Sequence, residues 1–219
     1  MDIRPLIDST LLKAEATHQD IGKLCREACQ FGFAAVCVNP FRLPLVVKML
    51  EGSAVAACTV AAFPLGAMTP SAKAEEVERA LEMGADEVDM VLNIGAVKDG
   101  DFTGVAREIN LAVNKVAKGR GLLKVIAETA LLNRDELQMV CRIAREEGVD
   151  FIKTSTGFSS RGASREDVRL IRAFAGEDIR IKASGGIRDY QYAVQLIQEG
   201  ADRLGVSNAA NLVRDYLQE

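Results

Sequence analysis

Three lysines stand inside short apolar segments of the sequence, although lysine is among the residue types least often found fully buried. The segments are "LKVIAET" (123–129), "DFIKTS" (150–155) and "IRIKAS" (179–184), and they contain Lys124, Lys153 and Lys182. Side chains alternate between the two faces of a strand, so Lys153 shares a face with Ser155, and Lys182 shares one with Ser184. If both faces point into one barrel, the two amines meet near its top.

An amine in such a place suits nucleophilic chemistry. A lysine normally titrates near a pKa of about 10.4, so a lysine nucleophile has to be partly neutral at pH 7. Desolvation and a neighbouring ammonium both lower the pKa of a lysine. We therefore predict that Lys153 or Lys182 is an amine nucleophile tuned by the other, with Asp89 as the partner for proton transfer. The alternative for any single strand lysine is a salt bridge that closes a barrel layer, and three such lysines favour chemistry.

Small and hydroxyl-bearing residues follow three of the apolar segments and predict a phosphate site. The three loops are "TSTGF" (154–158), "KASGGIRD" (182–189) and "GVSNAANL" (205–212). In barrels of alternating strands and helices, phosphate commonly binds after strands seven and eight, where backbone N–H groups and a helix dipole favour an anion. A Schiff-base lysine beside such a site indicates carbon–carbon bond chemistry on a sugar phosphate. The candidate residues of the loops are Thr156, Gly157, Gly185, Gly186, Ser207 and Asn208.

A short signature recurs along the chain: the tail of a helix, a glycine, then a short apolar strand. Its glycines are Gly32, Gly84, Gly148 and Gly200, and glycine is the usual residue just past the last helical turn. Together with the apolar segments between these glycines, the signature predicts eight strands, at 6–10, 34–39, 55–61, 87–93, 123–129, 150–155, 179–184 and 202–207. Helix starts between them are predicted at Thr17 with Asp20, at Thr69 before Pro70, and at 133–136 and 164–167.

Strict alternation of strand and helix, repeated eight times, predicts a single (β/α)8 TIM barrel with a parallel eight-stranded core over residues 1–219. A doubly wound open sheet is the alternative, but no G-x-G-x-x-G motif follows the first strand.

Composition excludes several other classes of protein. The net charge of -4 argues against a general nucleic-acid or membrane-surface binder. The uncharged stretch 52–72 contains Pro64, Gly66 and Pro70, so we expect a buried strand and a loop there, with no membrane span. Five cysteines without CxxC spacing, and no apolar leader at the start, predict reduced thiols in a cytoplasmic protein. The one histidine, His18, is expected to be a solvated residue in a first helical turn, which excludes a histidine-based triad.

The sequence resembles the deoxyribose-phosphate aldolase family. The resemblance rests on motifs in family order between residues 7 and 207: "IDSTLLKAEAT", "VCVNP", "FPLGA", "GADEVDMVLNIGA", "LKVIAETALL", "DFIKTSTGF", "KASGGIRD" and "GADRLGVS". It implies a class I aldolase that cleaves 2-deoxy-D-ribose 5-phosphate reversibly to D-glyceraldehyde 3-phosphate and acetaldehyde. The resemblance implies that no metal or organic cofactor is needed. It also implies a homo-oligomer, either a dimer or a tetramer.

The resemblance also implies roles for individual residues. Lys153 would form the Schiff base, Lys182 would lower the pKa of Lys153 and assist proton transfer, and Asp89 would join the proton relay through ordered water. The residues that match the lining of the family's substrate pocket are Asp8, Thr10, Cys37 and Lys124. Two positions depart from the family pattern. Ser9 stands where histidine is usual, and Asn208 follows Ser207 where the family commonly has two serines.

The sequence is also compatible with two other functions. One is another Schiff-base barrel, an aldolase or transaldolase that acts on a longer ketose phosphate. The other is a catalytically silent barrel that binds a phosphorylated sugar as a sensor. The presence of Lys153, Lys182 and Asp89 together favours an enzyme, because a sensor needs no activated amine.

Overall fold

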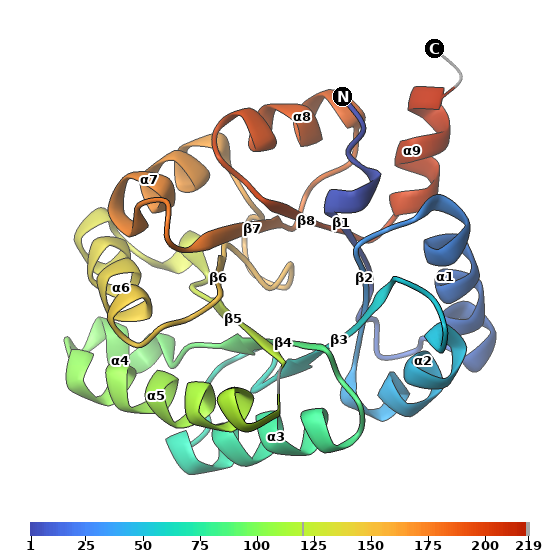
Figure 1. The fold of residues 1–219 in the computed structure, drawn as a ribbon. Helices are drawn as coiled ribbons and strands as arrows, with labels where there is room; N and C mark the ends of the chain where they lie inside the picture. The colour runs from blue at the N-terminus through green and yellow to red at the C-terminus, as the bar shows by residue number, and fades with distance from the viewer. Residues whose placement is uncertain (120, 218–219) are drawn as a thin grey trace.

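The computed structural model describes residues 1–119 and 121–217, and its central feature is a closed barrel of eight parallel strands (Figure 1). Each strand pairs with the next in chain order, and β8 pairs with β1. The predicted (β/α)8 barrel is therefore confirmed, and the open-sheet alternative is wrong. Each strand overlaps its predicted range: β1 Ile7–Leu11, β2 Ala35–Val38, β3 Ala56–Ala61, β4 Glu87–Val91, β5 Leu122–Ile126, β6 Phe151–Lys153, β7 Arg180–Ser184 and β8 Arg203–Val206.

Helices surround the barrel on its outside (Figure 1). They are α1 His18–Phe31, α2 Leu43–Leu50, α3 Pro70–Glu82, α4 Ile94–Lys98, α5 Phe102–Gly119, α6 Arg134–Glu146, α7 Arg165–Ala175, α8 Tyr190–Gln198 and α9 Ala209–Leu217. Short 3-10 turns lie at Arg4–Leu6, Pro40–Arg42 and Thr129–Leu131. No helix within the described residues is both long and apolar enough to cross a membrane.

The helices begin where the sequence predicts. The side chain of Thr17 accepts a hydrogen bond from the Asp20 amide, and the Asp20 carboxylate accepts one from the Thr17 amide, which completes a capping box for α1. The same reciprocal pair starts α6 and α7, at 133–136 and 164–167. Each such cap contributes typically about 1 kcal/mol, so these short sequences fix where the loops of the barrel end. His18 is the first residue of α1 and is exposed, as expected.

Side chains alternate between the two faces of each strand, and the buried apolar residues form two separate clusters. Outward-facing side chains such as Val36, Val125 and Ile181 pack against the helices in a large apolar cluster. A smaller apolar cluster lies separately and contains Cys37, Cys58 and Val60. The uncharged stretch 52–72 contains β3 and the loop that leads to α3, which confirms the strand and loop expected there. All five cysteines are free thiols.

Candidate active site

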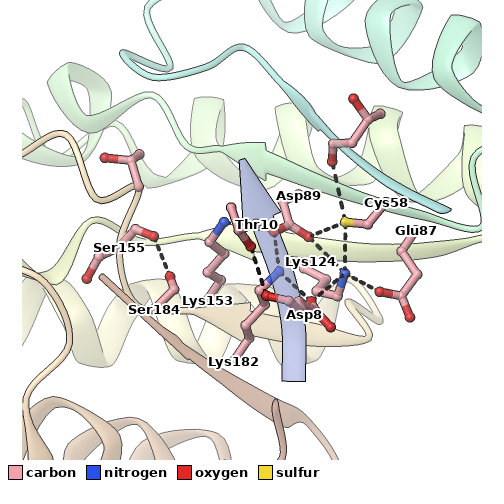
Figure 2. Close-up of polar contacts among 12 residues, drawn as sticks. Asp8, Thr10, Cys58, Glu87, Asp89, Lys124, Lys153, Ser155, Lys182 and Ser184 are labelled. Carbon is pink, nitrogen blue, oxygen red and sulfur yellow. Dashed lines mark hydrogen bonds and ion pairs between the residues drawn. The ribbon is translucent and has the colours of Figure 1, made fainter. Parts of the chain in front are cut away.

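The register of the strands places the strand lysines side by side. Lys153 pairs with Lys182 across β6 and β7, and Asp89 pairs with Lys124 across β4 and β5. The three ammonium groups converge on the carboxylate of Asp89, as Figure 2 shows. Lys124 Nζ lies 2.8 Å from Oδ1, whereas Lys153 Nζ and Lys182 Nζ lie 2.8 and 2.7 Å from Oδ2. The predicted meeting of Lys153, Lys182 and Asp89 is confirmed.

Three further charged residues extend this group into a buried network. Asp8 lies 2.5 Å from Lys182 Nζ and 2.7 Å from the guanidinium of Arg203. Glu87 lies 2.6 Å from Lys124 Nζ and 3.3 Å from Arg203. The network thus contains three carboxylates, from Asp8, Glu87 and Asp89, and four cations, from Lys124, Lys153, Lys182 and Arg203. It has one more cation than carboxylates.

The surrounding charges decide how the buried groups titrate. Burial works against the charged form of Asp89, yet the three ammonium groups hold the pKa of Asp89 well below its ordinary value. Burial likewise works against a charged Asp8, but its cationic neighbours lower the pKa of Asp8 to about 2. For Lys124 and Lys182, the nearby carboxylates outweigh burial and raise the pKa of both lysines above the ordinary value.

The raised pKa of Lys182 bears on which of the two lysines is the free amine. The sequence left open that Lys182 is the amine that loses its proton at neutral pH. In the structure Lys182 lies between the carboxylates of Asp8 and Asp89, and this surrounding negative charge favours its ammonium form. Lys182 is therefore a positive charge beside Lys153 in this structure.

Two cysteine thiols lie beside the buried charged network. Cys37 and Cys58 are register partners on β2 and β3, and both are fully buried. The Cys58 thiol donates a hydrogen bond to Asp89 Oδ1 at 3.4 Å, and burial raises the pKa of Cys58 well above its ordinary value. A hydrogen bond with Cys58 lowers the pKa of Cys37. Cys58 is thus in direct contact with the central carboxylate, whereas the sequence had singled out Cys37.

A cavity opens directly above the network, at the C-terminal ends of the strands. Of the predicted site residues, those that line it are Thr10, Lys153, Thr156, Gly157, Gly185, Gly186, Ser207 and Asn208. Lys182 and Asp8 each lie two residues before a lining residue on the same strand, Ser184 and Thr10. Lys153 is the member of the network that reaches the cavity wall.

The remaining predicted site residues lie below this wall. Asp8, Cys37, Asp89, Lys124 and Lys182 are all fully buried and do not line the cavity. The structure therefore places Asp8, Cys37 and Lys124, which the resemblance implied as lining residues, in the layer that supports Lys153. Their contact with a substrate stays a prediction.

Backbone contacts hold the loop after β6 against the loop after β7. Gly162 packs so closely on Gly185 that a Cβ atom at position 162 would lie 2.1 Å from the Gly185 carbonyl oxygen. Gly185 and Gly186 have φ values of +84° and +76°, a left-handed conformation that glycine adopts without strain. The glycine pair is thus required by the turn that exposes the backbone of this loop to the cavity.

Thr156 is oriented by a buried carboxylate just after β5. Glu128 follows β5 in a left-handed conformation, with φ of +51°. Its Oε2 accepts hydrogen bonds from the Thr156 amide, at 3.2 Å, and from the Thr156 hydroxyl. The Phe158 amide donates to the same hydroxyl oxygen at 3.0 Å. The hydroxyl proton of Thr156 is therefore used by Glu128, and the hydroxyl oxygen accepts from the Phe158 amide.

Sequence reasoning missed Glu87 and Arg203. A signal for Glu87 existed, because Glu87 and Asp89 are two residues apart and so share the inner face of β4. Arg203 is the first residue of β8 and lies two residues before Gly205, so the two share a face of the strand, and Gly205 lines the cavity. Pairing between these two and their partners depends on strand register, which the sequence pattern does not give.

The fold and the site together define an aldolase, and comparison with known proteins gives its family. Residues 4–208 match the family model described as DeoC/LacD family aldolase, so the chain belongs to this family. Among curated relatives, it is 51% identical to the deoxyribose-phosphate aldolase of Clostridium tetani (strain Massachusetts / E88), over 98% of this chain and 99% of that one. It is 50% identical to the deoxyribose-phosphate aldolase of Thermococcus gammatolerans (strain DSM 15229 / JCM 11827 / EJ3), over 97% and 96% of the two chains.

Solved structures agree with this assignment. The aldolase QR15 superposes with a TM-score of 0.94 at 38% identity, covering 100% of this chain and 97% of its own. The deoxyribose phosphate aldolase from Aeropyrum pernix, described as a tetramer, superposes with a TM-score of 0.92 at 32% identity, covering 98% and 91%. The family resemblance seen in the sequence motifs is confirmed.

Proposed function

We propose that the protein is a class I aldolase that cleaves 2-deoxy-D-ribose 5-phosphate reversibly to D-glyceraldehyde 3-phosphate and acetaldehyde, with Lys153 as the Schiff-base amine. The observation that carries the proposal is the position of Lys153. It lines the cavity, while Lys124, Lys182 and Asp89 are fully buried around its base. The family and its relatives named deoxyribose-phosphate aldolase support the reaction and the substrate.

The count of charges supports the choice of Lys153. Lys124, Lys182 and Arg203 each contact at least two carboxylates. Lys153 contacts only Asp89 among the described residues, and shares that carboxylate with two other ammonium groups. Lys153 is thus the amine with the fewest counter-ions in a network that has one surplus cation, which supports its assignment as the attacking amine.

The reaction follows from this arrangement. The free amine of Lys153 adds to the aldehyde carbon C1 of the open-chain sugar, and loss of water gives an iminium. A base takes the proton of the C3 hydroxyl, the C2–C3 bond breaks, and its electrons move into the iminium to form an enamine. D-Glyceraldehyde 3-phosphate leaves. Protonation of the enamine at C2 and hydrolysis then release acetaldehyde and restore the amine.

In the proposed reaction, Asp89 and Lys182 serve proton transfer to and from Lys153. Asp89 Oδ2 lies 2.8 Å from the amine of Lys153 and 2.7 Å from that of Lys182, so one carboxylate oxygen connects the two nitrogens. Such distances are within the reach required of a general acid or base. Lys124 contacts the other oxygen of Asp89 and keeps the carboxylate in this orientation.

The rest of the cavity suits the remaining parts of the substrate. Thr10 and Thr156 offer hydroxyl groups to the sugar, and Gly157 provides backbone approach. The turn at Gly185 and Gly186 and the start of α9 offer backbone N–H groups to the phosphate, together with the side chains of Ser207 and Asn208. Cys37, Asp8 and Lys124 support the amine from below, within the buried layer.

Product analysis tests the proposal. The protein is incubated with 2-deoxy-D-ribose 5-phosphate, and acetaldehyde is measured by coupled oxidation of NADH with alcohol dehydrogenase. We expect acetaldehyde and D-glyceraldehyde 3-phosphate in equal amounts, and neither product from a Lys153→Met control. Triose phosphate released from a longer ketose phosphate, without acetaldehyde, would identify the alternative aldolase. Binding of the sugar phosphate with no product would identify a sensor.

We also propose that residues 1–219 act as one catalytic domain, that the chain forms a homodimer or homotetramer, and that it works in the cytoplasm. The tetrameric aldolase from Aeropyrum pernix supports an oligomer, and the five free thiols support a reducing compartment. Light scattering of the purified protein measures its mass in solution. A monomer at micromolar concentration would contradict the oligomer.

A further inference from the structure

The cavity has two cations on its wall and no acid among the described residues that line it. The cations are Lys153, which contacts Asp89, and Lys13, which follows β1. Because Lys153 is occupied by the reacting carbonyl in the proposed function, Lys13 is the remaining positive charge that a bound anion can meet. Arg188, which follows the glycine turn after β7, is exposed and does not line the cavity.

Strand pairing places Lys13 beside the loop that carries Ser207 and Asn208. β1 and β8 are neighbours, with Ser9 in register with Val206. Lys13 lies four residues beyond Ser9, and Asn208 lies two residues beyond Val206, so both leave the barrel at the same edge. A second hollow adjoins the cavity there, and the residues common to both are Leu11, Lys13, Ser207 and Asn208.

The acids near Lys13 do not neutralise it. The adjoining hollow is also lined by Asp20 and Glu27. Asp20 is engaged in the capping box of α1, and Glu27 pairs with Arg214 at 3.0 Å. Glu15 lines the same hollow, but no carboxylate within the described part of the chain lies at ion-pair distance from the Lys13 ammonium. Lys13 therefore presents an unpaired charge at the end of the cavity where the glycine turn and the start of α9 also lie.

We infer that Lys13 supplies the cation for the phosphate of the substrate, and so determines the preference for a phosphorylated sugar. This rests on the proposed function, since it assigns the two ends of one substrate to Lys153 and Lys13. A phosphate monoester carries close to two negative charges at pH 7. Backbone amides and a helix dipole give only partial charges, so a full positive charge beside them adds an interaction that neutral donors do not provide. The flexible stem of lysine lets its ammonium follow the phosphate into the cavity.

Steady-state kinetics with two substrates test the inference. Lys13→Met should raise KM for 2-deoxy-D-ribose 5-phosphate about tenfold, the size expected for one hydrogen bond to a charged group, and leave kcat within about twofold. KM for unphosphorylated 2-deoxy-D-ribose should stay unchanged. Lys13→Arg should restore most of the affinity because it keeps the charge. Raising the salt concentration should increase KM in the wild type more steeply than in Lys13→Met.

Lys23→Met is the matched control. Lys23 lines the adjoining hollow but not the cavity, so its loss should leave both KM values unchanged. An equal effect of Lys13→Met on both substrates, or an equal effect of Lys23→Met on the phosphorylated one, would overturn the inference.

Binding of inorganic phosphate separates this inference from the proposed function. We expect 31P NMR titration to show binding to the wild type that weakens in Lys13→Met and not in Lys23→Met. If acetaldehyde is released normally but phosphate binds both proteins equally, the assignment of Lys13 is wrong and the aldolase function stands. If no acetaldehyde is released but phosphate binding depends on Lys13, the anion site stands and the proposed reaction is wrong.

Discussion

Replacing Asp89 with asparagine should destabilise the protein strongly, and by an amount that depends on pH. Asp89 is fully buried and its carboxylate lies within 2.8 Å of three ammonium groups. Asparagine keeps the volume and removes the charge, which leaves four cations facing two carboxylates. Removing one partner from a buried ion pair costs about 3–5 kcal/mol of unfolding free energy. We expect a loss of this size for Asp89→Asn at pH 6, together with loss of aldolase activity.

The pH dependence follows from proton linkage. In the variant, a lysine of the network can relieve the repulsion only by losing its proton, so the pKa of that lysine falls below its unfolded value near 10.4. The unfolded chain then binds more protons than the folded one, and stability rises with pH by up to about 1.4 kcal/mol per unit. The unfolding free energy of Asp89→Asn should therefore approach that of the wild type between pH 6 and pH 9.

Urea unfolding followed by far-UV circular dichroism at pH 6, 7.5 and 9 measures both effects. Asp99→Asn is the control, because Asp99 is an exposed carboxylate outside the network, and its change should stay within about 0.5 kcal/mol at every pH. A cost below about 1 kcal/mol for Asp89→Asn, or a cost that does not shrink as the pH rises, would refute the reasoning.

Three further substitutions test other parts of the site. Lys182→Leu should keep the fold, lose most of the activity and move the pH–rate profile upward, because the fixed charge beside Lys153 is gone; wild-type turnover with an unshifted profile would contradict its role. Asn208→Ser should lower KM for deoxyribose 5-phosphate, because serine adds at most one charge-assisted hydrogen bond to the phosphate, worth about 1.5–3 kcal/mol of binding free energy at most. KM for deoxyribose should stay unchanged. An equal change for both substrates would show that Asn208 does not contact phosphate. Thr156→Val should lower the unfolding free energy by about 1–3 kcal/mol, because it removes a donor from the buried carboxylate of Glu128. A neutral effect in urea unfolding would show that this hydrogen bond contributes little.

Much of the fold could be predicted because each βα unit carries its own local signals. Helix starts such as the Ser164 capping box and glycines past helix ends such as Gly32 need only neighbouring residues, and both are confirmed in the structure. Because these units repeat eight times, few arrangements of strands and helices are compatible with the sequence. Lys153 and Lys182 could be placed together because they occupy equivalent positions on consecutive strands.

The parts that could not be predicted depend on distant contacts. A one-residue change of register would turn every inward side chain outward, so the pairing of Arg203 with Asp8 and Glu87 could not be derived from alternation alone. The raised pKa of Lys182 depends on the same pairing, because its carboxylate partners lie on β1 and β4. Lys13 stands in a loop, where no periodic pattern marks the side chains that face a cavity.

Covalent trapping tests the central claim, that Lys153 is the amine that condenses with the substrate. The protein is incubated with acetaldehyde, reduced with sodium borohydride, digested and mapped by tandem mass spectrometry. We expect one ethyl group per chain, on Lys153, and none in Lys153→Met. An adduct on Lys182 or Lys124 in the wild type, or no adduct on a protein that still cleaves the sugar phosphate, would contradict the assignment.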